Sequence, residues 1–355
     1  MSETWRRTFA VSYVLLAFLL GCDGSDLDML GRLGAFWSLP ADEEWTGSPA
    51  PLGCAGSEAT IFARPETPRP DYEFVRAFAQ DDTNIYVALR DPHIWALAKS
   101  GGQAKLLWVG EDFQEAPTFM VLDDTHLYFT TSFTLRRVAR TGGPAETLVE
   151  GLLGPRQLAL DHSFAYWADA GALNEWRGRV GKVPKAGGAV TILADGTNAV
   201  GVSVSNGEVY YLVAGGAGAG GGIFKTSAAG GPATLVHAGG GGSQLLATPG
   251  HLFALMGNSV VRVDRRTGAS ETFVGSSVGG QSLAVDDTHV YWTVEGYWAG
   301  LPILQESGRV FQAAQAGGEV TALGSCLPKP QGIVVDARHV YWVNAISSEI
   351  LRLEK

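Results

Sequence analysis

The chain has 355 residues, is 46% hydrophobic and carries a formal net charge of −10. An acidic protein of this kind is a poor partner for phosphate backbones, so the composition disfavours nucleic-acid binding. The sequence contains no H-E-x-x-H or C-x-x-C element, so it offers no familiar zinc or redox motif and predicts no cofactor.

Residues 1–21 have the pattern of an export signal. Arg6 and Arg7 precede an apolar run from Phe9 to Leu20, which is too short to remain as a membrane-spanning helix. The run ends in Leu-Leu-Gly-Cys at Cys22 and resembles the lipobox of bacterial lipoproteins. The resemblance implies cleavage before Cys22, a lipid on its sulfur and attachment to the inner or outer membrane, with the protein outside the cytoplasm. A plain secretory signal with an incidental cysteine is the alternative.

Residues 22–56 are rich in Gly, Pro and acidic side chains, which bury too little apolar surface to order a segment fully. We interpret them as a tether between the lipid anchor and a folded body at 57–355. After Cys22, only Cys54 and Cys326 remain. In an oxidising compartment we expect these two cysteines to form one disulfide. Two separate thiols are the alternative.

An internal repeat occupies most of the remaining chain. Each copy has an apolar run, a polar turn and an aromatic run, as in Val285-Asp-Asp-Thr-His-Val-Tyr-Trp292. The copies recur every 38 to 50 residues, at anchor residues Asp81, Asp123, Asp161, Ser205, Thr248, Asp286 and Asp336. A third strand, a Gly-Gly turn and a fourth strand follow in most copies. Four short antiparallel strands at such a period are typical of a β-propeller blade.

The aromatic runs resemble a known repeat. Tyr291-Trp-Thr-Val294, Tyr341-Trp-Val-Asn344 and Tyr166-Trp-Ala-Asp169 resemble the YWTD repeat, which implies a propeller blade and leaves function open. YWTD propellers have six blades, but the count of copies here favours an all-β fold with seven, and six or eight fit less well.

The last copy ends at Lys355 after three strands, and the segment Glu58–Arg64 reads as a lone strand. We therefore expect this N-terminal strand to complete the seventh blade and close the ring, since an unpaired edge is prone to association. An open solenoid would leave both segments without partners and is the alternative.

Histidines and paired aspartates recur at the polar turns. His126, His251, His289 and His339 occupy one equivalent position, and Asp pairs stand at 81–82, 123–124 and 286–287. Equivalent turns of successive blades lie too far apart to share one ion, so we expect no metal site. Aspartate capping of local backbone groups explains the pattern better.

Binding residues are expected on one face of the ring. Loops from second to third strands share that face with the connections between blades, and the three insertions, 169–178, 214–222 and 294–308, fall in such loops. They carry Trp176, Tyr297 and Trp298, and exposed aromatic side chains are typical anchors of a binding surface.

A second group of candidates lies five residues before each anchor, where the first strands begin at the mouth of the central channel. This collar consists of Arg76, Thr118, Arg156, Val200, Ser243, Gln281 and Gln331. Such polar residues either hold a small ligand or a peptide end, or line a water-filled pore.

These patterns predict a non-enzymatic, monomeric envelope lipoprotein that presents a propeller face to a protein, peptide or glycan. No catalytic residue is assigned. Two alternatives stay open: a propeller lyase or hydrolase that acts on a polysaccharide or cyclic peptide, and a purely structural envelope component. Clustered carboxylates or a metal at the channel mouth would favour the enzyme, because acid–base catalysis needs groups within hydrogen-bond reach.

Overall fold

The part of the chain that the computed structural model describes is residues 59–63, 75–88, 92–171, 177–215, 220–257, 259–275, 280–295, 308–347 and 349–355. The predicted signal peptide, Cys22 and the tether up to residue 56 lie outside these ranges. Within them the regular secondary structure is β-strand, apart from the short 3-10 turn η3 (Phe113–Glu115). No helix in this part is long and apolar enough to cross a membrane.

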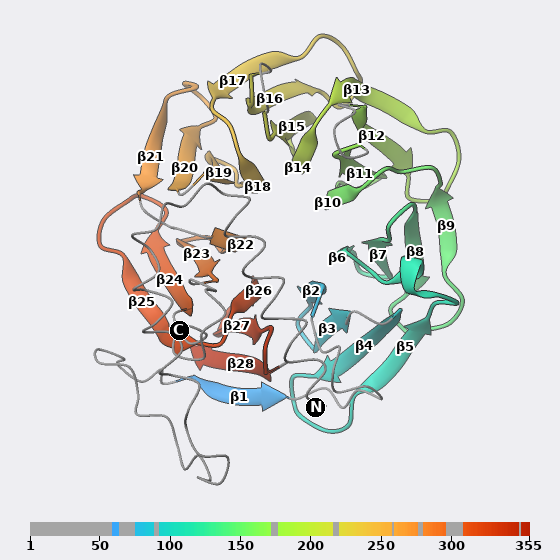
Figure 1. The fold of residues 1–355 in the computed structure, drawn as a ribbon, viewed down its shortest axis with the longest axis vertical. Coiled ribbons are helices and arrows are strands. Elements are labelled where there is room, and N and C mark those ends of the chain that lie inside the picture. The colour runs from blue at the N-terminus through green and yellow to red at the C-terminus, as the bar shows by residue number, and fades with distance from the viewer. Residues whose placement is uncertain are drawn as a thin grey trace, which may run out of the picture. The chain divides into compact units, whose positions relative to one another are not determined.

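The strands form seven four-stranded antiparallel sheets arranged in a ring, which confirms the prediction of a seven-bladed propeller (Figure 1). In six sheets the strands follow chain order from the centre outward. The first four of these contain β2 (Ala77–Gln80), β3 (Asn84–Ala88), β4 (His93–Ala98) and β5 (Lys105–Val109); β6 (Phe119–Leu122), β7 (His126–Thr130), β8 (Leu135–Ala139) and β9 (Glu146–Val149); β10 (Pro155–Leu160), β11 (Phe164–Asp169), β12 (Gly178–Pro184) and β13 (Thr191–Thr197); β14 (Ala199–Ser205), β15 (Glu208–Val213), β16 (Gly222–Ser227) and β17 (Thr234–Ala238).

The remaining three sheets complete the ring. They contain β18 (Gly242–Ala247), β19 (His251–Met256), β20 (Ser259–Asp264) and β21 (Ser270–Val274); β22 (Gly280–Val285), β23 (His289–Val294), β24 (Gly308–Ala314) and β25 (Thr321–Leu327); and β26 (Pro330–Val335), β27 (His339–Asn344), β28 (Glu349–Glu354) and β1 (Thr60–Ala63).

The seventh sheet joins the two ends of the folded body. β1 pairs antiparallel with β28, with Ile61 opposite Leu351. Phe62 lies edge-on to Tyr341, with 5.6 Å between ring centroids. The predicted closure of the ring by the N-terminal strand is therefore confirmed, and the C-terminal strand has a partner on both sides.

The recurring Tyr-Trp pair explains how neighbouring sheets hold together. Successive side chains of a strand point to opposite faces, so the tyrosine faces the following sheet and the next residue faces the preceding one. Tyr128 accordingly shares a buried cluster with Trp167 of the next sheet, and Tyr291 shares one with Trp342. In the third sheet Gly181 lies opposite Trp167, where a Cβ would stand 2.3 Å from the indole ring.

Each anchor aspartate caps the turn between the first two strands of its sheet. Asp81 Oδ1 accepts from the backbone N–H groups of Thr83 and Asn84, both at 2.7 Å, and Asp286 Oδ1 makes the same two bonds at 2.8 and 2.7 Å. The predicted capping role is confirmed. The histidines belong to the same turns, where the backbone N–H of His126 donates to Asp123 and its ring nitrogen pairs with Thr125.

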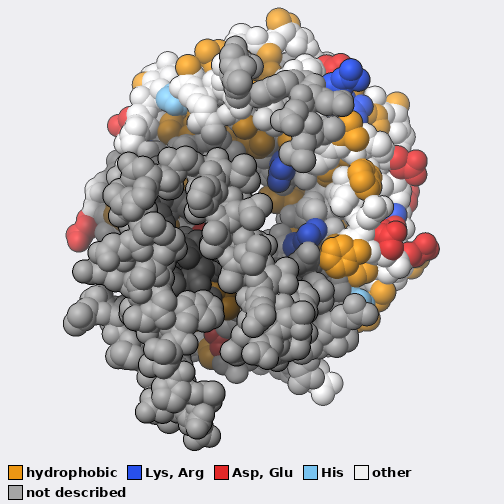
Figure 2. Space-filling view, viewed as in Figure 1, with side chains coloured by type: hydrophobic (Ala, Val, Ile, Leu, Met, Phe, Trp, Pro, Cys, Tyr) orange, Lys and Arg blue, Asp and Glu red, His pale blue; other side chains and the backbone are white. Residues whose placement is uncertain are grey.

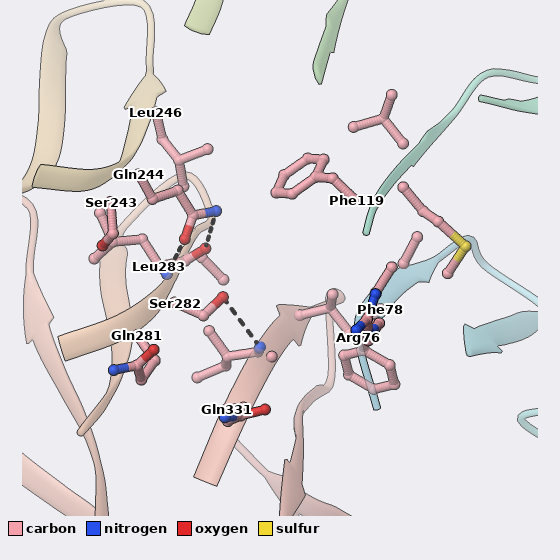
Figure 3. A pocket seen from close by; sticks show the side chains of 18 of the residues that line it. Arg76, Phe78, Phe119, Ser243, Gln244, Leu246, Gln281, Ser282, Leu283 and Gln331 are labelled. Atoms are coloured by element: carbon pink, nitrogen blue, oxygen red, sulfur yellow. Dashed lines mark hydrogen bonds between the residues drawn. The ribbon is translucent and has the colours of Figure 1, made fainter. Parts of the chain in front are cut away.

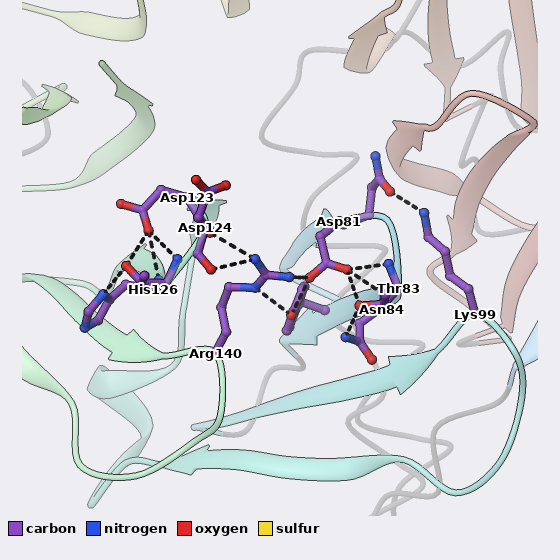
Figure 4. A network of polar contacts seen from close by, with 11 residues as sticks. Asp81, Thr83, Asn84, Lys99, Asp123, Asp124, His126 and Arg140 are labelled. Carbon is purple, nitrogen blue, oxygen red and sulfur yellow. Dashed lines mark hydrogen bonds and ion pairs between the residues drawn. The ribbon is translucent and has the colours of Figure 1, made fainter. Parts of the chain in front are cut away.

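In four sheets the second oxygen of the anchor carboxylate binds the tyrosine of its own sheet and a cation from the next. Tyr86 donates to Asp81 Oδ2 at 2.6 Å, and Arg140, which follows the third strand of the second sheet, pairs with the same oxygen (Figure 4). We call this Tyr–Asp–cation arrangement the blade clamp. It recurs with the ion pairs Lys185–Asp123 at 3.1 Å, Lys355–Asp286 at 2.6 Å and Lys99–Asp336 at 2.6 Å.

Three sheets depart from the blade clamp, each in a different way. The fifth sheet has Thr248 in place of the anchor aspartate, and the following sheet has the neutral Gln315 at the cation position. In the fourth sheet the anchor is Ser205, and Arg265 of the next sheet bonds its hydroxyl at 2.9 Å. In the third sheet the anchor Asp161 is retained, but the cation position of the following sheet is occupied by the uncharged Ala228.

The clamp determines how the carboxylates titrate. Burial raises the pKa of Asp81, but hydrogen bonds from Tyr86 and from the backbone of Thr83 and Asn84 outweigh this and lower it to about 2. Burial likewise raises the pKa of Asp336, and the bond from Lys99 with two backbone bonds brings it to about 2. Both carboxyl groups therefore bind protons more weakly in the folded protein than in the unfolded chain.

The clamp predicts a specific acid sensitivity. An unfolded aspartate has a pKa of about 3.9, so the stability from these groups is complete above about pH 4 and is lost as the pH falls toward about 2. Asp81→Asn should lower the free energy of unfolding at pH 7 by about 2 kcal/mol and flatten its pH dependence between pH 4 and 2. Urea unfolding across this range measures both effects. The exposed neighbour Asp82→Asn is the matched control, and an unchanged acid slope in Asp81→Asn would contradict the assignment.

Ring closure by β1 gives a second prediction. A chain of residues 64–355 leaves the edge of β28 unpaired, whereas 57–355 retains the partner strand. We expect the shorter chain to melt about 5–10 °C lower, the effect of losing a few kcal/mol in a domain of this size, and to self-associate through the open edge. Calorimetry and light scattering compare the two chains, and equal melting points with equal masses would refute the role of β1.

Candidate functional site

The three predicted insertions do connect second to third strands. They link β11 to β12, β15 to β16 and β23 to β24. In an antiparallel blade these loops lie at the same end as the connections from one sheet to the next, so they share one face of the ring. Trp176, Tyr297 and Trp298 themselves lie outside the described residues, and their role in binding stays a prediction.

The seven collar residues come together around one central cavity. This cavity, of about 900 Å³, is lined by the innermost strand of each sheet except the third and fourth, which contribute only their collar residues. Its rim includes Arg76, Thr118, Arg156, Val200, Ser243, Gln281 and Gln331. The repeat register predicted this grouping, because equivalent positions in successive blades lie around a common axis. A cavity of this volume is in the range that accommodates small molecules and peptide ends.

The charge of the cavity is opposite to that of the protein. Arg76 and Arg156 are exposed, and the described lining residues include no aspartate, glutamate, histidine or tyrosine. Figure 2 shows Lys or Arg side chains near the centre of the ring, whereas most visible Asp and Glu side chains lie toward its outer rim. A cleft with one sign of charge concentrates ligands of the other sign, so the cavity favours an anionic group.

One wall of the cavity is built by glutamine and serine side chains that join neighbouring inner strands (Figure 3). Gln244 of β18 accepts from the N–H of Leu283 at 2.7 Å and donates to its carbonyl at 3.4 Å. Gln80 of β2 donates to the carbonyl of Val335 in β26 at 2.9 Å. These bonds connect the inner strands of neighbouring sheets beside the cavity.

Gln157 makes a longer connection, from the third sheet to the fifth. It donates to the carbonyl of Leu245 at 2.7 Å and accepts from its N–H at 3.1 Å. The side chain crosses the fourth sheet at Gly201, where a Cβ would stand 3.0 Å from the glutamine oxygen. Glycine at this position therefore lets the bridge pass, and the buried amide is fully engaged.

The opposite wall is apolar. Phe78 and Phe119 line the cavity from β2 and the start of β6 (Figure 3). Met120 and Leu122 of β6 are also among the lining residues. The cavity therefore offers a ligand two different environments, hydrogen-bonding on one side and apolar on the other.

A second hollow opens beside the channel mouth. We call it the mouth groove; it has a volume of about 540 Å³ and is lined by Thr118, Thr131, Ser132, Phe133, Leu153, Gly154, Pro155, Arg156 and Gly171. Thr118 and Arg156 also line the central cavity. Arg156 therefore stands where the groove meets the cavity. Phe133 and Leu153 are 47% and 38% exposed, so the groove presents apolar surface to solvent.

The mouth groove is held by specific bonds. The buried carboxylate of Asp169 accepts from the N–H of Leu153 at 2.9 Å and from the N–H of Gly171 at 3.0 Å, which joins two groove walls. Arg179 lies 3.8 Å from the same carboxylate. Thr131 caps the four-residue turn that carries Phe133, with bonds to the N–H groups of Phe133 and Thr134. These loops are therefore fixed in shape before any ligand arrives.

Phe133, Leu153 and Asp169 were not among the predicted site residues. Phe133 stands in a short turn without an insertion, and Leu153 in an inter-sheet connection, so neither interrupts the repeat. Asp169 could have been singled out from the sequence, because it occupies the aspartate position of the YWTD pattern.

Two of the predictions concern metal ions and the cysteines. Across the described ranges no group of three or more His, Cys, Asp or Glu side chains is placed to hold a metal ion. Cys326 is disulfide-bonded, while Cys22 and Cys54 lie outside the described residues. The pairing of Cys54 with Cys326 stays a prediction.

No family model matches the chain, and no curated protein matches its sequence. Among solved structures, the fold is similar to a catalytically inactive virginiamycin B lyase from Staphylococcus aureus in complex with quinupristin (TM-score 0.64, 10% identity, 84% of this chain and 100% of that one). It is also similar to the WD40 propeller domain of Doa1 (0.62, 11%, 84% and 98%). The extracellular domain of a hybrid two-component system from B. thetaiotaomicron matches at 0.61 with 11% identity, over 82% of this chain and 39% of that one.

These similarities show the fold alone. A lyase, a WD40 domain and the extracellular domain of a two-component system share it, so the propeller does not by itself determine function. The repeats are thereby confirmed as propeller blades, seven in number where the YWTD resemblance implied six.

The role of Asp169 can be tested directly. Asp169→Ala leaves two backbone donors of the groove walls without their acceptor, and should cost about 3 kcal/mol of stability, as for loss of a buried charged partner. Hydrogen exchange should accelerate at the amides of Leu153 and Gly171. Asp195→Ala, which removes an exposed carboxylate, is the control. Unchanged protection at both amides would show that the groove is held by other contacts.

Proposed function

We propose that this chain is a non-enzymatic bacterial envelope lipoprotein, anchored through Cys22, whose propeller face binds a protein, peptide or glycan partner. The proposal rests on one observation: the collar, which includes Arg76 and Arg156, and the mouth groove adjoin each other. Both lie on the face of the three insertions. A fixed groove with exposed apolar side chains, next to a polar cavity, has the composition of a binding site.

The proposed location outside the cytoplasm rests on the export signal and lipobox of the sequence. The fold is compatible with it, since the similar structures include an extracellular domain and a surface component of the type-IX secretion system of Porphyromonas gingivalis. Both neighbours share only the fold with this chain, so the envelope assignment depends on Cys22.

The enzyme alternative has less support from the geometry. A lyase or hydrolase needs an acid and a base poised on the substrate, and the described residues that line the cavity and the groove include no His, Tyr, Asp or Glu. Similarity to virginiamycin B lyase at 10% identity does not transfer its activity. A purely structural role would leave the groove without a ligand.

Binding can be tested on arrays of immobilised peptides and glycans. We expect the purified protein to retain a defined subset, and the combined change of Trp176, Tyr297 and Trp298 to alanine to reduce retention at least about tenfold, because aromatic anchors dominate such interfaces. The melting temperature should not change, since the three residues stand in loop insertions.

Two outcomes would contradict this proposal. Equal retention by the triple variant would exclude the insertion face as the binding surface. A mass change in a captured ligand after incubation would reveal turnover and favour the lyase or hydrolase.

A further inference from the structure

Arg156 is placed to receive an anion. Its side chain is exposed, lines both the mouth groove and the central cavity, and makes no hydrogen bond or ion pair with any other residue that the structure describes. Other arginines of the chain are engaged, as Arg140 is with Asp81 and Arg179 with the carbonyl of Gly151. A guanidinium presents its donors in a fork that matches a carboxylate.

Apolar surface lies next to this charge. Phe133 and Leu153 line the same groove and are among the more exposed large apolar side chains of the described chain. Their backbones are held by Thr131 and Asp169, respectively. Because a ligand that covers them loses little loop entropy on binding, this pair favours a partner with an apolar side chain close to its negative group.

We propose that the mouth groove binds the carboxyl-terminal end of a peptide, with the terminal carboxylate on Arg156 and the last apolar side chain against Phe133 and Leu153. This inference rests on the proposed binding function and names its ligand class. The groove volume of about 540 Å³ suits a few residues. Upstream residues of the peptide would run outward over the insertion-bearing face, and the cavity with Arg76 adds favourable potential behind the carboxylate.

Other anions fit the groove less well. Inorganic phosphate would use Arg156 but leave Phe133 and Leu153 exposed. An acidic sugar brings hydroxyl groups that need partners on every side, whereas these two groove residues offer only apolar side chains.

The test is calorimetric titration of the purified full-length protein with short defined peptides. Acetyl-Gly-Gly-Leu-Phe with a free carboxylate should bind at least about tenfold more tightly than the same peptide as its C-terminal amide, because a hydrogen-bonded charge pair is lost. Acetyl-Gly-Gly-Leu-Gly should also bind more weakly, since it lacks the apolar side chain.

Substitutions assign the effect to the groove. Arg156→Gln should reduce the affinity for the free acid to that of the amide, and Arg156→Lys should retain part of the preference. Arg266→Gln, which removes an exposed charge from a third-to-fourth turn on the opposite face, is the matched control and should behave as wild type. Leu153→Ser should erase the preference for phenylalanine over glycine. Because Arg156 is exposed, its variants should melt at the wild-type temperature.

Several results would overturn the inference. These are equal affinity for acid and amide, a preference that survives Arg156→Gln, no binding of any free-acid peptide, and tighter Arg156-dependent binding of phosphate or digalacturonate than of the peptide. The proposed function is tested by a different result: it fails when the triple aromatic variant still retains the array ligands. If the triple variant loses these ligands but Arg156→Gln leaves the affinity for the free-acid peptide unchanged, the partner binds elsewhere on the same face.

Discussion

The blade clamp is the interaction on which the ring depends. The strand pairing lies within each sheet, so most contacts that set the angle between sheets are side-chain contacts. The buried aromatic clusters hold neighbouring sheets together but do not require one particular angle between them. The Tyr–Asp–cation arrangement does, because it joins specific atoms of adjacent sheets. At one junction both charges are lost together, at Thr248 and Gln315, whereas Asp161 keeps its carboxylate and Arg265 keeps its cation without the usual partner.

The clamp and the candidate site lie on opposite faces of the ring. First-to-second turns hold the anchor aspartates, while the inter-sheet connections and the second-to-third loops form the groove and rim. This separation lets the loops of one face vary in length while the charges that set the sheet angles remain fixed. The three insertions accordingly interrupt no clamp.

Much of the architecture was predictable from the sequence, because the repeat carries its own register. The spacing of the anchors predicted seven blades, the lone segment around Ile61 predicted closure, and the same register placed the collar around one axis. The mouth groove was not predictable. It depends on the approach of the Phe133 turn to the Leu153 connection and on the buried bonds of Asp169, which join segments of two sheets. The bridge of Gln157 past Gly201 depends likewise on the distance between three sheets. Local patterns contain no information on such distances.

The pairing of β1 with β28 has a mechanical consequence. Any tension that enters the ring from the residues before Thr60 acts first on this short strand. A pull along the strand loads its bonds to Arg352, Leu351 and Ile350 together, in shear, and the edge contact of Phe62 with Tyr341 resists the same displacement. The short β1–β28 pairing therefore limits the force that the seventh sheet withstands before the ring opens at this point.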